Sequence, residues 1–334
     1  MAERLALVSK PDAERAIASL RERGVYDPDR SVREHGADTV GIPVTREVDA
    51  PAVLAVVEDA DPVPRTRGLA DRLRECGHDP AALSPPASWA VVGSVVLADF
   101  DGCAAPEAVG EALLDLHGEA ETVLDRGGVA GPHREPDVSV VAGTGETATV
   151  HVEHGTVYGL DLAEVMFSPG NKAERRRTGE VVDPDERVLD MFAGVGYFAL
   201  PAARAGADVL AVERNPAAFR HLVANARRNG VADRVRPVLA DCRDTAARRD
   251  LAVDRVFMGH FDAPAYLDAA LGALAPGGVV HLHATGPADD PFAVAVEHLG
   301  DAAADRGGVR IRDRRVVKST GPGVVHVVVE AERR

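Results

Sequence analysis

A glycine-rich turn in the second half of the chain has the residue types with the clearest chemical use. Gly194 and Gly196 follow residues 187–190, which are predicted to form a short buried strand, and Glu213 ends the next apolar run, seventeen residues after Gly196. Glycines permit a tight turn that approaches a ligand closely, and a carboxylate at the end of the following strand accepts hydrogen bonds from both hydroxyls of a ribose. The spacing predicts a nucleoside-binding pocket, although an isolated Gly-x-Gly also occurs as a purely structural turn in α/β domains.

The turn lacks the third glycine of a dinucleotide-binding motif. In G-x-G-x-x-G the pyrophosphate lies at a helix N-terminus beside a third glycine, but Ala199 and Leu200 occupy that part of this chain. The pocket therefore suits a nucleoside with a compact amino-acid tail, such as S-adenosylmethionine, better than NAD.

Strand and helix patterns alternate regularly around this turn, which predicts an α/β domain with a doubly wound, mainly parallel sheet. Two final apolar runs flank residues 321–323 and predict an antiparallel hairpin at the sheet edge. Such a hairpin is typical of a Rossmann-like class I methyltransferase domain and not of a dehydrogenase. The expected strands are 188–190, 209–213, 235–240, 255–258 and 278–283, the expected helices are 216–229, 263–275 and 291–304, and the hairpin strands are 309–317 and 324–330.

The chain before this domain has less regular patterns. Its 334 residues exceed what one hydrophobic core usually organises, so we expect two small α+β domains ahead of the Rossmann-like one. In the middle domain we expect one buried strand at 90–100, a helix at 106–117, and strands at 139–142, 147–153 and 156–161. The expected division is a small domain at 1–50, a proline-rich linker at 51–85, the middle domain at 86–164 and the catalytic domain at 165–334.

Ligands of such sheets bind beyond the carboxyl ends of the parallel strands, which places four segments around one crevice. Asp241 follows the third strand, where it can accept from the adenine amine beside the backbone of Cys242; the alternative is a helix N-cap. Upstream, a turn runs into a basic helix, so Ser168 and Arg175 are candidates to bind the carboxylate of an amino-acid tail. The candidate cofactor-binding residues are Ser168, Arg175, Asp190, Phe192, Ala193, Gly194, Gly196, Glu213, Arg214, Asn215, Asp241, Cys242 and Met258.

The composition is strongly acidic. The net charge of −15 comes from 53 acidic and 38 basic residues, and the basic residues are nearly all arginine. This pattern is typical of halophilic proteins, because salt screens the repulsion among surface carboxylates. The three cysteines are isolated, so we expect neither a metal site nor disulfides. Without an apolar run near membrane length or a charged-then-apolar leader, a cytoplasmic protein that does not contact a membrane is expected.

Four motifs resemble those of a known family. They are FSPGN at 167–171, DMFAGVGYF at 190–198, ERNP at 213–216 and MGH at 258–260. These motifs are similar to those of the archaeal and eukaryotic wyosine-pathway tRNA aminocarboxypropyltransferases, which are related to the archaeal-type tRNA guanine-37 N1-methyltransferases. The resemblance implies two N-terminal domains that help to hold tRNA and a C-terminal domain that binds S-adenosylmethionine as group donor.

Three differences favour the aminocarboxypropyl branch. The methyltransferases have an Asn-Leu-Pro or Asn-Pro-Pro motif where this chain has Met258-Gly259-His260, more often Asp than Glu213, and often Pro instead of Tyr197. The resemblance then implies transfer of the 3-amino-3-carboxypropyl group to C7 of 4-demethylwyosine at position 37 of tRNA(Phe), with release of methylthioadenosine. Guanine-37 N1-methylation with the same cofactor is the alternative, and a tRNA-binding protein without activity is a third hypothesis.

The implied partner is the anticodon loop of tRNA(Phe), and no obligate protein partner is expected. Tyr197 or Phe261 is a candidate to receive the unstacked base. The catalytic residues stay open, with His260 and Tyr197 as candidates, although His260 also fits an exposed loop histidine. Arg176 and Arg177 either face RNA phosphates or form a solvated helix face. Two alternatives also hold for the basic residues of the terminal hairpin, which either bind phosphates or form a charged sheet edge. These residues are Arg310, Arg312, Arg314, Arg315 and Lys318.

Overall fold

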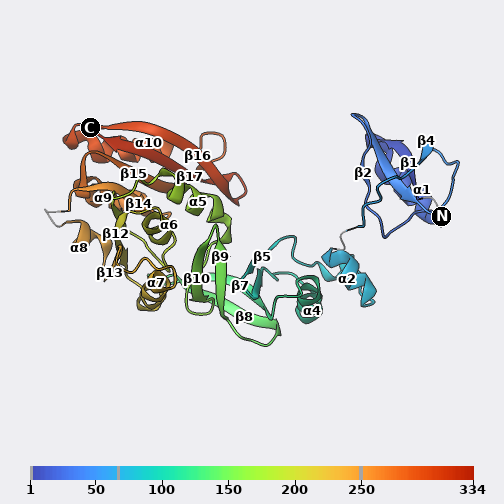
Figure 1. Ribbon diagram of the computed structural model, residues 1–334, viewed down its shortest axis with the longest axis horizontal. Helices are drawn as coiled ribbons and strands as arrows, with labels where there is room; N and C mark the ends of the chain where they lie inside the picture. Colours follow the sequence, from blue (N-terminus) through green and yellow to red (C-terminus); the bar gives the residue numbers. More distant parts are fainter. Residues whose placement is uncertain (1–2, 66–67, 248–250) are drawn as a thin grey trace. The chain divides into compact units, whose positions relative to one another are not determined.

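The computed structural model describes residues 3–65, 68–247 and 251–334. The chain forms two compact units, Met1–His78 and Asp79–Arg334 (Figure 1). In the part that is described, no helix is long and apolar enough to cross a membrane.

The first unit is a four-stranded antiparallel sheet with one face covered by a helix. The strand order is β2-β3-β1-β4. Alternate residues of β1 and β3 face inward, where Val8 and Ile42 pack against Leu20 of α1. The elements are β1 (Arg4–Ser9), η1 (Lys10–Asp12), α1 (Ala13–Glu22), β2 (Arg33–Glu34), β3 (Thr39–Val44), β4 (Val53–Glu58) and α2 (Leu69–Glu75).

The segment 51–85, expected to be a linker, contains strand β4 and the helices α2 and α3 (Pro80–Leu83). Its apolar residues 53–57 form strand β4, which pairs with β1. The prolines that suggested a linker come after this strand, at Pro62 and Pro64. The first unit accordingly extends to His78 instead of ending near residue 50.

The second unit begins with a four-stranded sheet, β5-β6-β7-β8, and a separate β9-β10 hairpin. The single strand expected at 90–100 is wrong: the run forms two strands, because Gly93 adopts a φ of +58° and turns the chain between them. Strand β7 was not expected, since Gly127 and Gly128 interrupt its apolar pattern. The elements are α3 (Pro80–Leu83), β5 (Trp89–Val92), β6 (Val95–Ala98), α4 (Pro106–Leu116), β7 (Thr122–Ala130), β8 (Glu135–Gly143), β9 (Ala148–Glu153) and β10 (Thr156–Asp161).

The rest of the second unit is a seven-stranded sheet of order β13-β12-β11-β14-β15-β17-β16. Strands β11 to β15 are parallel, while β17 pairs antiparallel with β15 and with β16. The predicted doubly wound sheet with a terminal hairpin is therefore confirmed. The strands are β11 (Arg187–Asp190), β12 (Asp208–Glu213), β13 (Val235–Leu239), β14 (Val253–Met258), β15 (Leu274–Pro287), β16 (Val309–Gly321) and β17 (Val324–Arg333).

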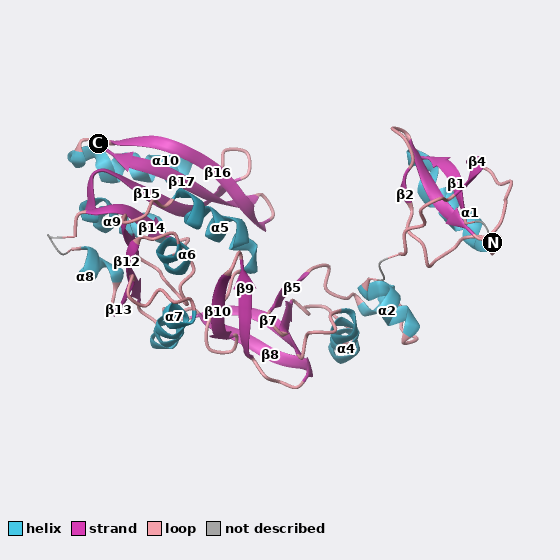
Figure 2. Ribbon diagram, viewed as in Figure 1, coloured by secondary structure: helices cyan, strands magenta, loops and turns pink. Residues whose placement is uncertain are grey.

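Helices cover both faces of this sheet (Figure 2). One core lies under α6 and α7 and contains Leu200 and Leu222, and the other lies under α8 to α10 and contains Leu271 and Leu299. The strand order reverses between β11 and β14, which is where a ligand crevice opens in such folds. The helices are η2 (Pro169–Asn171), α5 (Lys172–Val181), α6 (Ala199–Arg204), α7 (Pro216–Arg228), α8 (Cys242–Ala246), η3 (Ala263–Tyr266), α9 (Leu267–Ala273), α10 (Ala293–Ala303) and η4 (Ala304–Arg306).

Candidate active site

The glycine turn after β11 is held by the buried carboxylate of Asp190. Asp190 Oδ1 accepts from the Phe192 N–H at 3.3 Å, and Oδ2 accepts from the Ala199 N–H at 3.0 Å. These bonds join the turn to the start of α6. Burial raises the pKa of Asp190 to about 7 in spite of these donors. Asp190 is fully buried and therefore stabilises the turn from the protein interior.

The two glycines are required by both backbone conformation and space. Gly194 has a φ of +55° and Gly196 a φ of +108°, which side-chain-bearing residues rarely adopt. A Cβ on Gly194 would lie 2.2 Å from the ring of Tyr197, and one on Gly196 would lie 2.5 Å from Cγ of Leu200. The turn therefore packs tightly against the residues that follow it.

Glu213 at the end of β12 is bonded to this turn. Its Oε2 accepts from the Gly194 N–H at 2.7 Å, and its Oε1 accepts from the Asn215 N–H at 2.6 Å. Burial raises the pKa of Glu213, and the backbone donors counteract this effect. The carboxylate is thereby fixed in position at the edge of a cavity.

The cavity has a volume of about 800 Å³, within the range of small-molecule sites. It lies at the carboxyl ends of the parallel strands and is also lined by residues of the middle sheet and of the terminal hairpin. The predicted site residues that line it are Ser168, Phe192, Gly194, Tyr197, Glu213, Arg214, Asn215, Asp241, Cys242 and His260. The predicted residues Arg175, Asp190, Ala193, Gly196 and Met258 are not part of its lining.

Arg175 departs most clearly from its expected place. Its guanidinium is 2.6 and 2.9 Å from the two carboxylate oxygens of Glu153, and its side chain is 2% exposed. It also donates to the carbonyl of Ser168 and lies over the ring of Phe167. In this structure Glu153 therefore occupies the guanidinium fork for which the sequence suggested a cofactor carboxylate.

The hydroxyl of Tyr197 is hydrogen-bonded to the backbone. It donates to the carbonyl of Met166, and the tyrosine ring packs against Phe167 with centroids 5.7 Å apart. Burial raises the pKa of Tyr197, so the phenol stays protonated. The residue forms a wall of the cavity, and its hydroxyl is already hydrogen-bonded to the backbone.

Asp241 is the N-cap of α8, as one of its two interpretations proposed. Its Oδ1 accepts from the Arg243 N–H at 2.9 Å, and its Oδ2 lies 2.7 Å from the Arg243 guanidinium. The hydrogen bond from this guanidinium lowers the pKa of Asp241 to about 2. Because Asp241 also lines the cavity, capping does not preclude contact with a ligand.

Aromatic side chains form another wall. Phe192 stacks on His260 at 5.2 Å and meets Tyr266 edge-on at 5.1 Å. His260 Nδ1 accepts from the Asp262 N–H, and its Nε2 lies 3.3 Å from the Arg134 guanidinium. Burial and the charge of Arg134 lower the pKa of His260, so the imidazole is neutral at pH 7.

Several lining residues lie outside the motifs that predicted the cofactor site. His133 and Arg134 lie in the turn between β7 and β8, and the His133 carbonyl accepts from the Asn215 side chain at 3.0 Å. His283, Lys318 and His326 come from β15 and the terminal hairpin. These residues meet the glycine turn only through the tertiary fold.

Three buried polar atoms that line the cavity have no partner among the described residues. They are Arg134 Nε, Asn171 Oδ1 and His326 Nδ1. Buried polar atoms are nearly always hydrogen-bonded in folded proteins. Their concentration around one cavity indicates a polar ligand, which fits the amino-acid end of S-adenosylmethionine.

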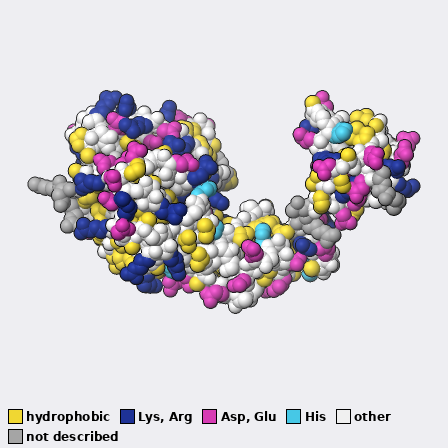
Figure 3. Space-filling model, viewed as in Figure 1, with side chains coloured by type: hydrophobic (Ala, Val, Ile, Leu, Met, Phe, Trp, Pro, Cys, Tyr) yellow, Lys and Arg dark blue, Asp and Glu magenta, His cyan; other side chains and the backbone are white. Residues whose placement is uncertain are grey.

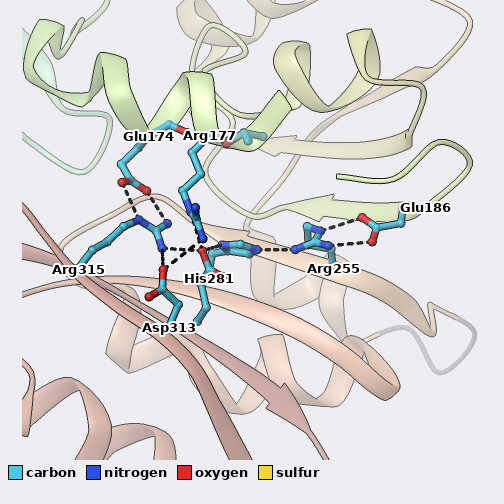
Figure 4. Close-up of polar contacts among 9 residues, drawn as sticks. Glu174, Arg177, Glu186, Arg255, His281, Asp313 and Arg315 are labelled. Atoms are coloured by element: carbon cyan, nitrogen blue, oxygen red, sulfur yellow. Dashed lines mark hydrogen bonds and ion pairs between the residues drawn. The ribbon is translucent and has the colours of Figure 1, made fainter. Parts of the chain in front are cut away.

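An ion-pair network joins α5 to the terminal hairpin (Figure 4). Arg315 of β16 binds both carboxylate oxygens of Glu174, at 2.8 and 2.7 Å, and also contacts Glu330. Arg177 binds Glu330 and Asp313. The network continues through His281 and Arg255 to Glu186.

Several basic residues for which phosphate binding was one of two alternatives are paired with neighbouring carboxylates. Arg310 and Arg312 both pair with Glu332, and Arg176 pairs with Glu180. Arg314 lies over the ring of Phe292. In the view of Figure 3, acidic and basic side chains are interspersed on the second unit and form no single basic face.

The sequence of the chain is similar to those of known tRNA-modifying enzymes. The model of the TRM5/TYW2 methyltransferase domain matches residues 149–311. A tRNA(Phe) (4-demethylwyosine(37)-C(7)) aminocarboxypropyltransferase of Pyrococcus horikoshii is 35% identical over 278 residues, which cover 80% of this chain and 98% of that protein. The enzyme of the same name from Methanocaldococcus jannaschii is 38% identical over 209 residues, covering 61% of this chain and 82% of its own.

Solved structures agree with this result. P. horikoshii TYW2 in complex with MeSAdo superposes with a TM-score of 0.66 at 32% identity, over 79% of this chain and 97% of that one. Wild-type Trm5b from Pyrococcus abyssi superposes with a TM-score of 0.74 at 27% identity, over 99% of each chain.

Proposed function

The chain belongs to the family of the TRM5/TYW2 tRNA-modifying enzymes, and we propose from this premise that it transfers the 3-amino-3-carboxypropyl group of S-adenosylmethionine to C7 of 4-demethylwyosine at position 37 of tRNA(Phe). The observation that carries the proposal is the match to the P. horikoshii aminocarboxypropyltransferase over 98% of the length of that enzyme. S-adenosylmethionine is the group donor, and tRNA is the substrate.

The cavity supports this assignment. We assign the ribose to Glu213, which Gly194 and Asn215 hold in position, and the adenine to the side of Asp241 after β13; both residues line the cavity. Gly194 of the turn after β11 also lines the cavity, and we assign the sulfonium to its side. P. horikoshii TYW2 was crystallised with MeSAdo and M. jannaschii TYW2 with AdoMet, so these relatives bind the same class of ligand.

The proposed reaction needs little acid–base chemistry. C7 of the base attacks the γ-carbon of the amino-acid tail, the bond from this carbon to sulfur breaks, and sulfur keeps the electron pair. Methylthioadenosine leaves as a neutral thioether, and the proton on C7 passes to solvent. Since all carbons on the sulfonium are electrophilic, the protein selects the product by positioning the γ-carbon against the base.

The parts of the chain have corresponding proposed roles. The base is presented by the anticodon loop, where it unstacks at low cost. Residues 165–334 bind the cofactor, and the residues before them help to hold the tRNA.

Guanine-37 N1-methylation is the second candidate, because Trm5b of P. abyssi is 30% identical over 255 residues and superposes on the whole chain. The product separates the two reactions. We expect the protein to release methylthioadenosine from labelled S-adenosylmethionine with tRNA(Phe) that contains 4-demethylwyosine. Release of S-adenosylhomocysteine with tRNA that contains guanosine at position 37 would establish the methyltransferase instead.

A further inference from the structure

Lys318 lies in the wall of the cavity although it comes from the terminal hairpin. Its Nζ is 3.0 Å from Oγ of Ser168, which also lines the cavity. A Cβ on Gly170 would lie 2.9 Å from both Cδ and Nζ of Lys318. The glycine at this position therefore leaves the space that the lysine side chain occupies.

The ammonium of Lys318 has no carboxylate within ion-pair distance among the described residues. This distinguishes it from Arg310, Arg312 and Arg315 on the same strand, each of which is paired. Burial lowers the pKa of Lys318, as do the charges of Arg175 and Arg126. A half-buried cation with cations around it is stabilised when an anion binds beside it.

A polar atom of Asn171, which lines the same cavity, has no hydrogen-bond partner among the described residues. Asn171 Oδ1 is buried and unbonded, and the Asn171 N–H donates to the Ser168 carbonyl at 3.2 Å. Asn171 and Ser168 thus belong to one turn. An acceptor without a hydrogen-bond partner and a cation without a carboxylate partner, in the lining of one cavity, match a ligand that carries a positive and a negative group on one carbon atom, as an α-amino acid does.

We propose that Lys318, Ser168 and Asn171 form the subsite for the amino-acid end of S-adenosylmethionine. Lys318 and the Ser168 hydroxyl bind the α-carboxylate, and Asn171 Oδ1 accepts from the α-ammonium. This subsite takes the role that the sequence suggested for Arg175, and it rests on the proposed function for the identity of the ligand.

The fold fixes the two halves of this subsite relative to each other. Ser168 and Asn171 immediately precede α5, whereas Lys318 lies on β16. The pair between Glu174 of α5 and Arg315 of β16 holds these two elements together (Figure 4). A tail drawn toward the hairpin is anchored at its far end, which leaves the γ-carbon between the anchor and the sulfonium.

Calorimetric titration of the full chain with three ligands tests the subsite. S-adenosylmethionine has the carboxylate, decarboxylated S-adenosylmethionine lacks only that group, and methylthioadenosine lacks the whole amino-acid tail. For Lys318→Met we expect S-adenosylmethionine to bind about tenfold more weakly or worse, as for loss of a charged hydrogen bond. The affinities for the other two ligands should change by less than about twofold.

Two further variants complete the design. Lys172→Met removes an exposed lysine outside the cavity lining and should leave all three affinities unchanged. Gly170→Ala keeps Lys318 but displaces the end of its side chain, so S-adenosylmethionine alone should bind about threefold more weakly.

The outcomes separate the subsite from the proposed function. If Lys318→Met weakens all three ligands equally, or none of them, the subsite is wrong. If it weakens only tRNA binding, Lys318 binds an RNA phosphate and the subsite is also wrong. The two proposals can also fail separately. If the wild-type protein releases S-adenosylhomocysteine, but Lys318→Met still weakens only S-adenosylmethionine binding, the proposed transfer is wrong and the subsite is correct.

Discussion

Glu213 and Gly194 are joined by a hydrogen bond of 2.7 Å from the glycine N–H to the carboxylate Oε2. The acidic residue that we propose for the ribose is therefore bonded to the glycine turn after β11. A ligand that bonds to Glu213 meets a carboxylate that is already oriented, which lowers the entropy lost on binding.

Replacing Glu213 should affect the ligand more than the fold. Glu213→Gln keeps the size and one acceptor oxygen, so the Gly194 N–H retains a partner, while the charge-assisted bonds to the ribose are lost. We expect S-adenosylmethionine affinity to fall by about tenfold to a hundredfold and the free energy of unfolding by about 1 kcal/mol. Calorimetry and urea denaturation measure the two effects, and unchanged affinity for methylthioadenosine would exclude Glu213 from the ribose site.

Phe261 is suited to receive the target base. Its side chain lines the cavity, is 37% exposed, and has its ring 5.0 Å from that of His326 in an edge-on arrangement. Base stacking on an aromatic ring contributes about 1–3 kcal/mol, so Phe261→Ala should raise the KM for tRNA by about tenfold with unchanged affinity for S-adenosylmethionine. Phe261→Tyr keeps the stacking surface and should restore the KM. Equal losses in both variants would contradict stacking.

Salt should stabilise this protein. The net charge of −15 includes exposed like charges such as Glu107 and Glu111, one turn apart on α4. We expect the unfolding temperature to rise between about 0.1 M and 1 M KCl, because the Debye length falls from about 10 Å to 3 Å. Glu111→Lys replaces this repulsion with an i,i+4 attraction and should add about 0.5 kcal/mol at low salt. An unfolding temperature that is independent of salt would contradict a halophilic adaptation.

The sequence predicted the part of the site that is local in the chain. Gly194 and Gly196 lie in the turn after β11 and Glu213 ends β12, within one β-α-β unit where spacing and residue type determine geometry. The terminal hairpin was predictable for the same reason, since its two strands are adjacent in sequence. The helix cap at Asp241 was also foreseen, as one of two alternatives.

The rest depends on partners that are distant in the chain. The charge on Arg175 suggested a carboxylate ligand, but its partner Glu153 lies on β9 and packs against it only in the folded protein. Arg134 and Lys318 reach the cavity from a turn and an edge strand that have no motif of their own. The sequence therefore did not indicate whether a positive side chain pairs with a carboxylate of the protein or stays available to a ligand.

The pair between Glu153 and Arg175 should make stability depend on acidity. Burial raises the pKa of Glu153, but the hydrogen bonds from His151 and Arg175 outweigh it and lower the pKa from 4.5 to about 2. A carboxyl group whose pKa is lower in the folded protein than in the unfolded chain stabilises the fold above the unfolded value, and this contribution is lost as the pH falls. We therefore expect the free energy of unfolding to decline between pH 4.5 and about 2.

Glu153→Gln should remove this part of the decline. It should also lower the free energy of unfolding at pH 7 by about 3 kcal/mol, because Arg175 stays buried without a counter-charge. Urea denaturation at several pH values measures both effects, and an identical pH dependence in the two proteins would show that Glu153 does not carry it.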